Sequence, residues 1–241
     1  MRLKIASRRS DLARLQAYLV GQKIMESNPE TLIEYNFKES IGDINLTDPL
    51  WKAPEKGVFT EDFYSDLTEG RCDLVVHSWK DLPIVDKEHT FVAGTLTRAD
   101  ARDVLLFKKS SLERMSRDLR FLSSSPRRNY NLSSFFTWSL PFEVDSIAFE
   151  SVRGNIPTRI KKFLESSSDG LIVAKAALDR LCTTSLTELS ETKSFIFKAL
   201  ESLKFQVIPL TANPPCAGQG ALAIECRKSD FTFCINVLVA G

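Results

Sequence analysis

The sequence predicts an α/β protein of two domains, and three observations support this. Short apolar runs that suit buried strands alternate with stretches that suit helices, an order typical of mainly parallel sheets. The chain has 241 residues, more than one average domain. Polar or Pro- and Gly-rich stretches near residues 100 and 215 suit crossings between domains. We therefore expect a discontinuous domain 1, residues 1–98 plus 217–241, and an inserted domain 2, residues 99–216.

Domain 1 is expected to begin with a strand and a helix for which Ser10 is the N-cap and which Asn28 and Pro29 end. A long polar segment at residues 41–57 has little periodicity, and loops of that length are usually functional lids or disordered. The expected strands are 2–6, 32–37, 73–77, 91–96 and 221–226, with helices over 12–24, 58–67 and 231–239.

Domain 2 repeats the alternation. Three serines, Ser123 to Ser125, precede a helix that Pro126 opens, and Pro157 stands at the first position of another helix. The expected strands are 103–107, 119–122, 142–147 and 170–173, and the expected helices start at 126, run over 157–164, end near 181 and cover part of 183–204.

Composition excludes several classes of protein. Lys and Arg number 32 against 31 Asp and Glu, so the basic excess usual in nucleic-acid binders is missing. No apolar run approaches the roughly 20 residues of a membrane helix, and residues 1–20 show no secretory signal. Five cysteines without CxxC spacing fit reduced thiols in the cytoplasm, and two histidines argue against a His-based metal cluster.

The stretch at residues 73–83 is the strongest candidate site. Leu74 to Val76 suit a buried strand, and His77, Ser78, Lys80 and Asp81 follow at once. Ligands of open α/β sheets lie at the carboxyl ends of strands, so a carboxylate beside a lysine at this point is a candidate acid/base or ion-stabilising group. A solvated Lys-Asp turn is the alternative, and these few residues taken alone favour it.

Cationic residues recur after predicted strands and at helix starts. A guanidinium group binds a carboxylate through two parallel hydrogen bonds, and helix N-termini favour anions. Convergence of these cationic residues on a cleft between the domains would therefore suit a polycarboxylate ligand. Scattered surface charges are the alternative, and the serines at 123–125 could simply cap a helix. No G-x-S-x-G elbow is present, and no histidine is clearly positioned to activate Cys216 as a nucleophile. The cations are Arg8, Arg9, Lys52, Lys56, Lys80, Arg127, Arg128, Arg153 and Arg159.

Eight motifs in order along the chain resemble the hydroxymethylbilane synthases, also called porphobilinogen deaminases, which join four porphobilinogen molecules head to tail with release of ammonia. The motifs are ASRRSDLA (6–13), KGVFT (56–60), VHSWKDLP (76–83), RD (102–103), SSSPRR (123–128), VRGNIPTR (152–159), ALDRL (177–181) and GQGALAIECR (218–227). The resemblance implies two domains like those of type II periplasmic binding proteins, and a heme-pathway transferase.

The resemblance also implies residue roles. Asp81 corresponds to the catalytic aspartate, and Lys52 and Lys56 lie in or beside the family's mobile active-site loop. The remaining matches imply contacts to substrate and to a dipyrromethane cofactor, and no metal is implied. The implied substrate- and cofactor-binding residues are Arg8, Ser10, Lys52, Lys56, Ser78, Lys80, Ser124, Ser125, Arg127, Arg128, Arg153, Gly154, Asn155, Arg159, Arg180 and Gln219.

One departure separates this chain from the family. The family's third domain carries a Gly-Cys-x-x-Pro-type loop whose cysteine holds the cofactor covalently, and this sequence contains no such loop. We expect a two-domain form that is naturally short, truncated or without priming; a porphobilinogen- or linear-pyrrole-binding protein that is weakly catalytic or inactive is the alternative. A cytoplasmic monomer is expected, with a homodimer through surface left by the missing domain as the alternative, and no nucleic-acid or membrane partner.

Overall fold

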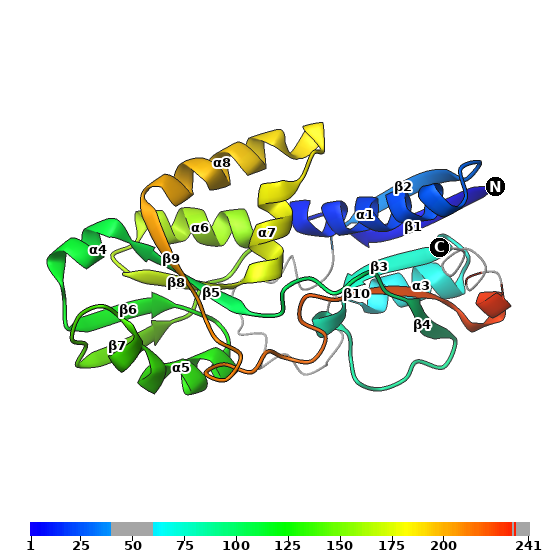
Figure 1. The fold of residues 1–241 in the computed structure, drawn as a ribbon. Coiled ribbons are helices and arrows are strands. Elements are labelled where there is room, and N and C mark those ends of the chain that lie inside the picture. Colours follow the sequence, from blue (N-terminus) through cyan, green and yellow to red (C-terminus); the bar gives the residue numbers. More distant parts are fainter. Residues whose placement is uncertain (40–59, 233, 235–241) are drawn as a thin grey trace. The chain divides into compact units, whose positions relative to one another are not determined.

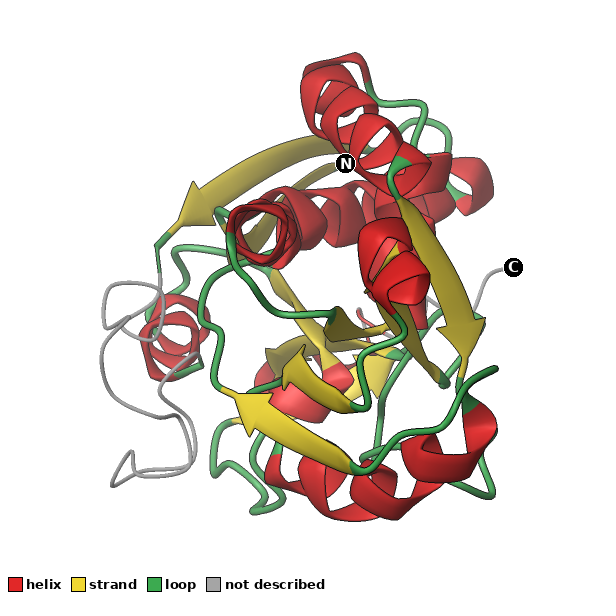
Figure 2. Ribbon diagram, turned by 90° about the vertical axis from the view of Figure 1, so that its left-hand side faces the viewer, coloured by secondary structure: helices red, strands yellow, loops and turns green. Residues whose placement is uncertain are grey.

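The computed structural model describes residues 1–39, 60–232 and 234. The chain divides into two compact units. Unit 1 comprises Met1–Ala99 and Ala217–Gly241, and unit 2 comprises Asp100–Cys216. Each unit holds a five-stranded sheet with helices packed against it, as the ribbons in Figures 1 and 2 show.

Unit 1 is built on a sheet of order β2-β1-β3-β10-β4. Strand β1 pairs in parallel with both β2 and β3, whereas β10 is antiparallel to both β3 and β4. Helix α1 packs against β1 and β3, and α3 packs against β3, β4 and β10. Its elements are β1 (Arg2–Arg8), α1 (Asp11–Ser27), β2 (Leu32–Lys38), α3 (Glu61–Thr68), β3 (Leu74–Ser78), the 3₁₀ turn η2 (Trp79–Asp81), β4 (Thr90–Gly94), β10 (Leu222–Arg227) and the 3₁₀ turn η4 (Lys228–Asp230).

Unit 2 has the corresponding order β7-β6-β8-β5-β9. Strands β7, β6 and β8 are parallel neighbours, and β5 is antiparallel to β8 and β9. Its elements are β5 (Asp103–Lys108), α4 (Lys109–Arg114), β6 (Asp118–Leu122), α5 (Pro126–Ser139), β7 (Ser146–Glu150), α6 (Ile156–Glu165), β8 (Gly170–Ala174), α7 (Lys175–Thr183), the 3₁₀ turn η3 (Thr187–Leu189), α8 (Ser190–Glu201) and β9 (Leu203–Val207).

The predicted α/β class of two domains is confirmed, and both sheets are mixed, with two parallel and two antiparallel pairings in each. In each unit a single strand runs against the other four, and that strand is β10 in unit 1 and β5 in unit 2. Both strands are the first that the chain forms after it passes from one unit into the other. The exceptions to parallel pairing therefore occur where the chain enters a unit from outside.

Apolar packing holds each unit. The core of unit 1 gathers Leu3 and Ile5 of β1, Leu74 and Val76 of β3 and the inner face of α1. In unit 2, phenylalanines supply much of the core, and the rings of Phe121 and Phe136 meet edge to face with centroids 5.1 Å apart. Such aromatic pairs contribute beyond the area they bury.

Some element boundaries differ from the sequence prediction. The strand predicted over 142–147 is displaced, because Phe142 packs on the core before the chain enters β7 at Ser146. Helix α4 and strand β9 were not predicted, and β9 is an edge strand whose Phe205 is exposed, so its apolar pattern does not mark a buried face. The loop predicted at 41–57 lies outside the described residues, as does most of the closing helix predicted at 231–239.

No helix among the described residues combines the length and the apolar character needed to cross a membrane.

Candidate active site

Asp81 lies beside Arg8 in unit 1. Arg8 is the last residue of β1, and Asp81 lies in η2 directly after β3, the parallel neighbour of β1, so both residues lie at the same edge of the sheet. Asp81 Oδ2 is 3.8 Å from Arg8 Nη1, and the two side chains are 34% and 27% exposed. This carboxylate and guanidinium are therefore within reach of a ligand in solvent, at the edge where α/β sheets place their sites.

Helix α1 is tied to the strand that leads to Asp81. Ser78 Oγ donates to Oε1 of the buried Gln16 at 3.1 Å, and Ser7 Oγ lies within hydrogen-bond distance of the carbonyl oxygens of Ala13 and Val76. The hydrogen bond between Ser78 and Gln16 therefore holds the end of β3 against α1.

Ser10 takes the N-cap position of α1 as predicted, with extended backbone, but its side chain makes no capping hydrogen bond.

The predicted residues Lys80 and Gln219 lie at different depths. Lys80 is exposed in η2, next to Asp81. Gln219 is buried, and its carbonyl accepts a hydrogen bond from Arg98 Nε at 3.0 Å.

His77 is buried in unit 1 and pairs with a carboxylate. Its Nε2 is 2.8 Å from Glu225 Oε2 on β10, and Thr90 Oγ1 donates to Glu225 Oε1 at 2.5 Å. Lys87 Nζ lies 3.0 Å from Glu225 Oε1. Burial alone would raise the pKa of Glu225, but hydrogen bonding and charge from His77, with Lys87 and Thr90, lower it to about 2.

The sequence prediction did not identify this buried pair. It grouped His77 with the polar residues after the strand, and it gave Glu225 no role. A carboxylate in the middle of the apolar run 221–226 was the signal available, since buried charges are usually paired.

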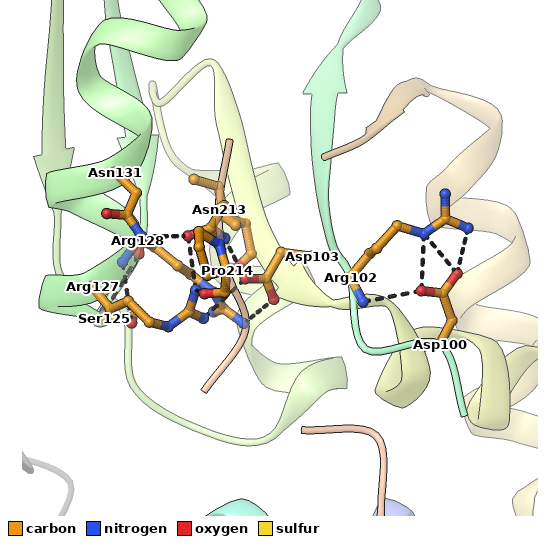
Figure 3. A network of polar contacts seen from close by, with 11 residues as sticks. Asp100, Arg102, Asp103, Ser125, Arg127, Arg128, Asn131, Asn213 and Pro214 are labelled. Carbon is orange, nitrogen blue, oxygen red and sulfur yellow. Dashed lines mark hydrogen bonds and ion pairs between the residues drawn. The ribbon is translucent and has the colours of Figure 1, made fainter. Parts of the chain in front are cut away.

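In unit 2, Arg127 and Arg128 converge on one buried carboxylate, Asp103 (Figure 3). Arg128 Nη2 donates to Asp103 Oδ1 at 2.7 Å, and Arg127 Nη2 donates to Oδ2 at 3.0 Å. Asn213 Nδ2 adds a bond of 2.7 Å to Oδ2. Although burial opposes ionisation, the two guanidinium groups lower the pKa of Asp103.

The two arginines differ in their remaining contacts. Arg127 Nη1 donates to Asn213 Oδ1 at 2.7 Å and to the Pro214 carbonyl at 2.6 Å. Arg128 is buried; its Nη1 donates to the Ile172 carbonyl at 3.2 Å, and its Nε has no hydrogen-bond partner among the described residues. Both side chains thus have protein partners. From the sequence, Asp103 was noted only within the RD motif, and neither Asp103 nor Asn213 was predicted as a partner of the arginines.

The serine run supports the loops after β6 and β7. Ser124 Oγ donates to the Val152 carbonyl at 2.5 Å and accepts from the Val152 N–H at 2.9 Å. Ser125 is the N-cap of α5, and its Oγ accepts the Arg128 N–H at 3.4 Å. The capping alternative therefore holds for Ser125, while Ser124 joins the two loops.

The N-terminus of α6 is shaped by Gly154 and Asn155. Gly154 has φ +118, a conformation that favours glycine, and Asn155 Oδ1 accepts the Thr158 N–H at 3.0 Å as the N-cap. Arg159 Nε donates to the Gly154 carbonyl at 2.7 Å, and Arg153 is half-buried just before the turn. Because β6 and β7 are parallel neighbours, the starts of α5 and α6 lie at one edge of the sheet.

Three predicted residues remain. Arg180 lies on α7, and its burial lowers its pKa. Lys52 and Lys56 lie outside the described residues. Among the described residues, no group of three or more His, Cys, Asp or Glu side chains could hold a metal ion.

Comparison with known proteins gives the family. A family model described as porphobilinogen deaminase, dipyromethane cofactor binding domain, matches residues 3–234. The chain is 32% identical over 230 residues to a probable porphobilinogen deaminase of Methanopyrus kandleri, covering 95% of this chain and 68% of that protein. It is 34% identical over 230 residues to the porphobilinogen deaminase of Chlorobium phaeobacteroides, covering 95% and 66%.

A third relative is the porphobilinogen deaminase of Campylobacter hominis, at 32% identity over 227 residues, covering 93% of this chain and 66% of that protein. The chain thus spans about two thirds of the length of these curated relatives. Since the family model covers nearly all of the chain, the protein belongs to the porphobilinogen deaminase family.

Proposed function

We propose that this protein is a hydroxymethylbilane synthase, a transferase that condenses four porphobilinogen molecules head to tail and releases ammonia. The observation that carries the proposal is the Asp81 carboxylate beside Arg8, both reachable from solvent at the carboxyl ends of parallel strands. Membership of the family supports the reaction class.

Asp81 is proposed as the catalytic residue. Its carboxylate can accept hydrogen bonds from pyrrole N–H groups and stabilise the positive charge that develops on a pyrrole as its amino group leaves. It can also accept the proton that a pyrrole carbon loses when the new carbon–carbon bond forms. Arg8 suits a carboxylate of the substrate, because a guanidinium can bind it with two parallel hydrogen bonds.

A dipyrromethane cofactor is proposed to bind through its carboxylates. The N-termini of α5 and α6 lie at one edge of the sheet of unit 2 and offer N–H donors near cationic side chains, which fits an acidic pyrrole. When bound, the cofactor would supply the pyrrole that the growing chain extends. The residues proposed to contact substrate or cofactor are Arg8, Ser10, Lys52, Lys56, Ser78, Lys80, Ser124, Ser125, Arg127, Arg128, Arg153, Gly154, Asn155, Arg159, Arg180 and Gln219.

The two compact units are proposed to be the two domains of the family fold, in a cytoplasmic protein that acts on a small molecule. The near-zero net charge of +1 argues against a nucleic-acid partner.

A binding protein for porphobilinogen or linear pyrroles is the second candidate. It would use the same Asp81 and Arg8 pair to hold a pyrrole without the condensation step.

Intact-mass spectrometry of the purified chain, beside an assay of hydroxymethylbilane formation from porphobilinogen, separates the candidates. Turnover with the bare-chain mass would support an enzyme with a non-covalently held primer. Turnover with an added mass of two pyrrole units would mean that one of the present cysteines anchors the primer. Binding of porphobilinogen without ammonia release would refute the enzyme and support the binding protein.

A further inference from the structure

We infer that Gly218 is a positioning residue for Asp81: the lack of a side chain at residue 218 lets the turn at 217–220 lie directly against the backbone of η2, which carries the carboxylate. The inference rests on the proposed function, because that proposal gives Asp81 its reacting role.

The approach at Gly218 is close. A Cβ added there would lie 3.0 Å from Trp79 Cβ, 3.1 Å from Trp79 Cγ and 3.1 Å from the backbone nitrogen of Lys80. These separations are tighter than nine in ten real Cβ contacts. Because two of the three atoms are the backbone nitrogen and a Cβ, rotation of a side chain cannot relieve the contact. The segment Trp79–Asp81 itself would have to move.

The glycine turn is also held by hydrogen bonds from residues 98 and 99, so its position is restrained. Arg98 Nε donates to the Gln219 carbonyl at 3.0 Å, and the Ala99 N–H donates to the Gly220 carbonyl at 3.1 Å. The chain beyond the turn enters β10, an interior strand that pairs with β3 and β4. A side chain at residue 218 would therefore displace the three-residue turn η2 rather than the glycine turn.

One hydrogen bond joins the two segments directly. The Trp79 N–H donates to the Ala221 carbonyl at 3.1 Å, and this fixes the start of η2 to the start of β10. Asp81 is two residues further on, with its carboxylate 3.8 Å from Arg8. A shift of a few tenths of an ångström at Trp79 and Lys80 would consequently change the direction of the carboxylate.

The chain provides a matched control for the substitution. Gly218 has φ +71 and Gly70 has φ +72, so alanine meets the same unfavourable positive φ at both positions. At Gly70, however, an added Cβ would have nothing within 4 Å. Both glycines belong to unit 1. The difference between Gly218→Ala and Gly70→Ala therefore isolates the contact with η2 from the strain.

The test compares both variants of the full chain by amide resonances in ¹⁵N-correlated NMR spectra and by turnover of porphobilinogen. For Gly218→Ala we expect displaced resonances of Trp79, Lys80 and Asp81. We also expect kcat to fall about tenfold with KM within about twofold, because a misplaced group costs the reaction step more than binding. For Gly70→Ala we expect unchanged resonances at these three residues and wild-type kcat.

Unmoved resonances of Trp79 to Asp81 in Gly218→Ala would overturn the inference, as would equal losses of kcat in the two variants. If the unmodified chain shows no turnover, the proposed function fails, while the resonances still decide the positioning role. Should Gly218→Ala not fold, Arg98→Ala removes one of the hydrogen bonds that hold the turn. Displacement of the same three resonances would then support the inference, and their constancy would overturn it.

Discussion

Replacing Asp103 with asparagine should destabilise unit 2 strongly. The Asp103 side chain is fully buried and accepts hydrogen bonds from Arg128, Arg127 and Asn213 at 2.7, 3.0 and 2.7 Å. Asparagine keeps the shape but removes the charge and turns an amide N–H₂ group toward donors. The Arg128 side chain is only 8% exposed and cannot regain water without moving α5. Removal of one partner of a buried ion pair typically costs about 3–5 kcal/mol of unfolding free energy.

Asp100→Asn is the matched control, because it breaks an Asp–Arg pair three residues away. Arg102 Nη2 donates to Asp100 Oδ2 at 2.6 Å, and Arg102 lowers the pKa of Asp100 to about 2. The Arg102 side chain is 45% exposed, so solvent screens the pair and its loss should cost less than about 1 kcal/mol. The pKa shift would suggest a larger effect, and the exposure of the arginine decides against it.

Urea unfolding followed by circular dichroism and fluorescence measures the difference. With a slope of about 2 kcal/mol per molar urea, Asp103→Asn should lower the midpoint by roughly 2 M and the control by less than roughly 0.5 M. If the two units unfold in separate steps, the shift belongs to the transition that includes β5 and α5. Equal midpoints for the two variants would refute the reasoning that Arg128 depends on this carboxylate.

Three further predictions concern both units. The folded-state pKa of Glu225 is about 2 against 4.5 for the free group, so its ionised form should stabilise the fold by about 3 kcal/mol above pH 4.5. This stabilisation should be lost as the pH falls toward 2, so the melting temperatures of wild type and Glu225→Gln should converge at low pH. A difference in melting temperature that does not depend on pH would contradict the assignment. Asp81→Asn should reduce turnover by roughly 100-fold at unchanged melting temperature. The control Asp86→Asn changes an exposed carboxylate and should keep full turnover. Equal turnover rates in the two variants would eliminate Asp81 as the catalytic group. Asn155→Ala removes the α6 cap and should cost about 1 kcal/mol in urea unfolding, and a change within error would show that the cap contributes little.

Local pattern was sufficient for the elements that bury a continuous apolar run or start with a capping residue. The run at residues 74–76 lies in β3, and Pro126 and Pro157 stand in the first turns of α5 and α6. These features depend on a few neighbouring residues, so the sequence alone determines them. The sequence also carried the family assignment, because its motifs recur in order along the chain.

Tertiary structure alone decided which charges meet. Asp103 and Arg128 are 25 positions apart, and His77 and Glu225 are 148 positions apart. Strand order brings His77 and Glu225 together, because β10 lies antiparallel beside β3. Arg128 reaches Asp103 because helix α5 packs in the same core as β5. Periodicity reports whether a residue is buried but not which strand lies beside it. For that reason the sequence identified the arginines and the histidine, and only the fold supplied the carboxylates that hold them.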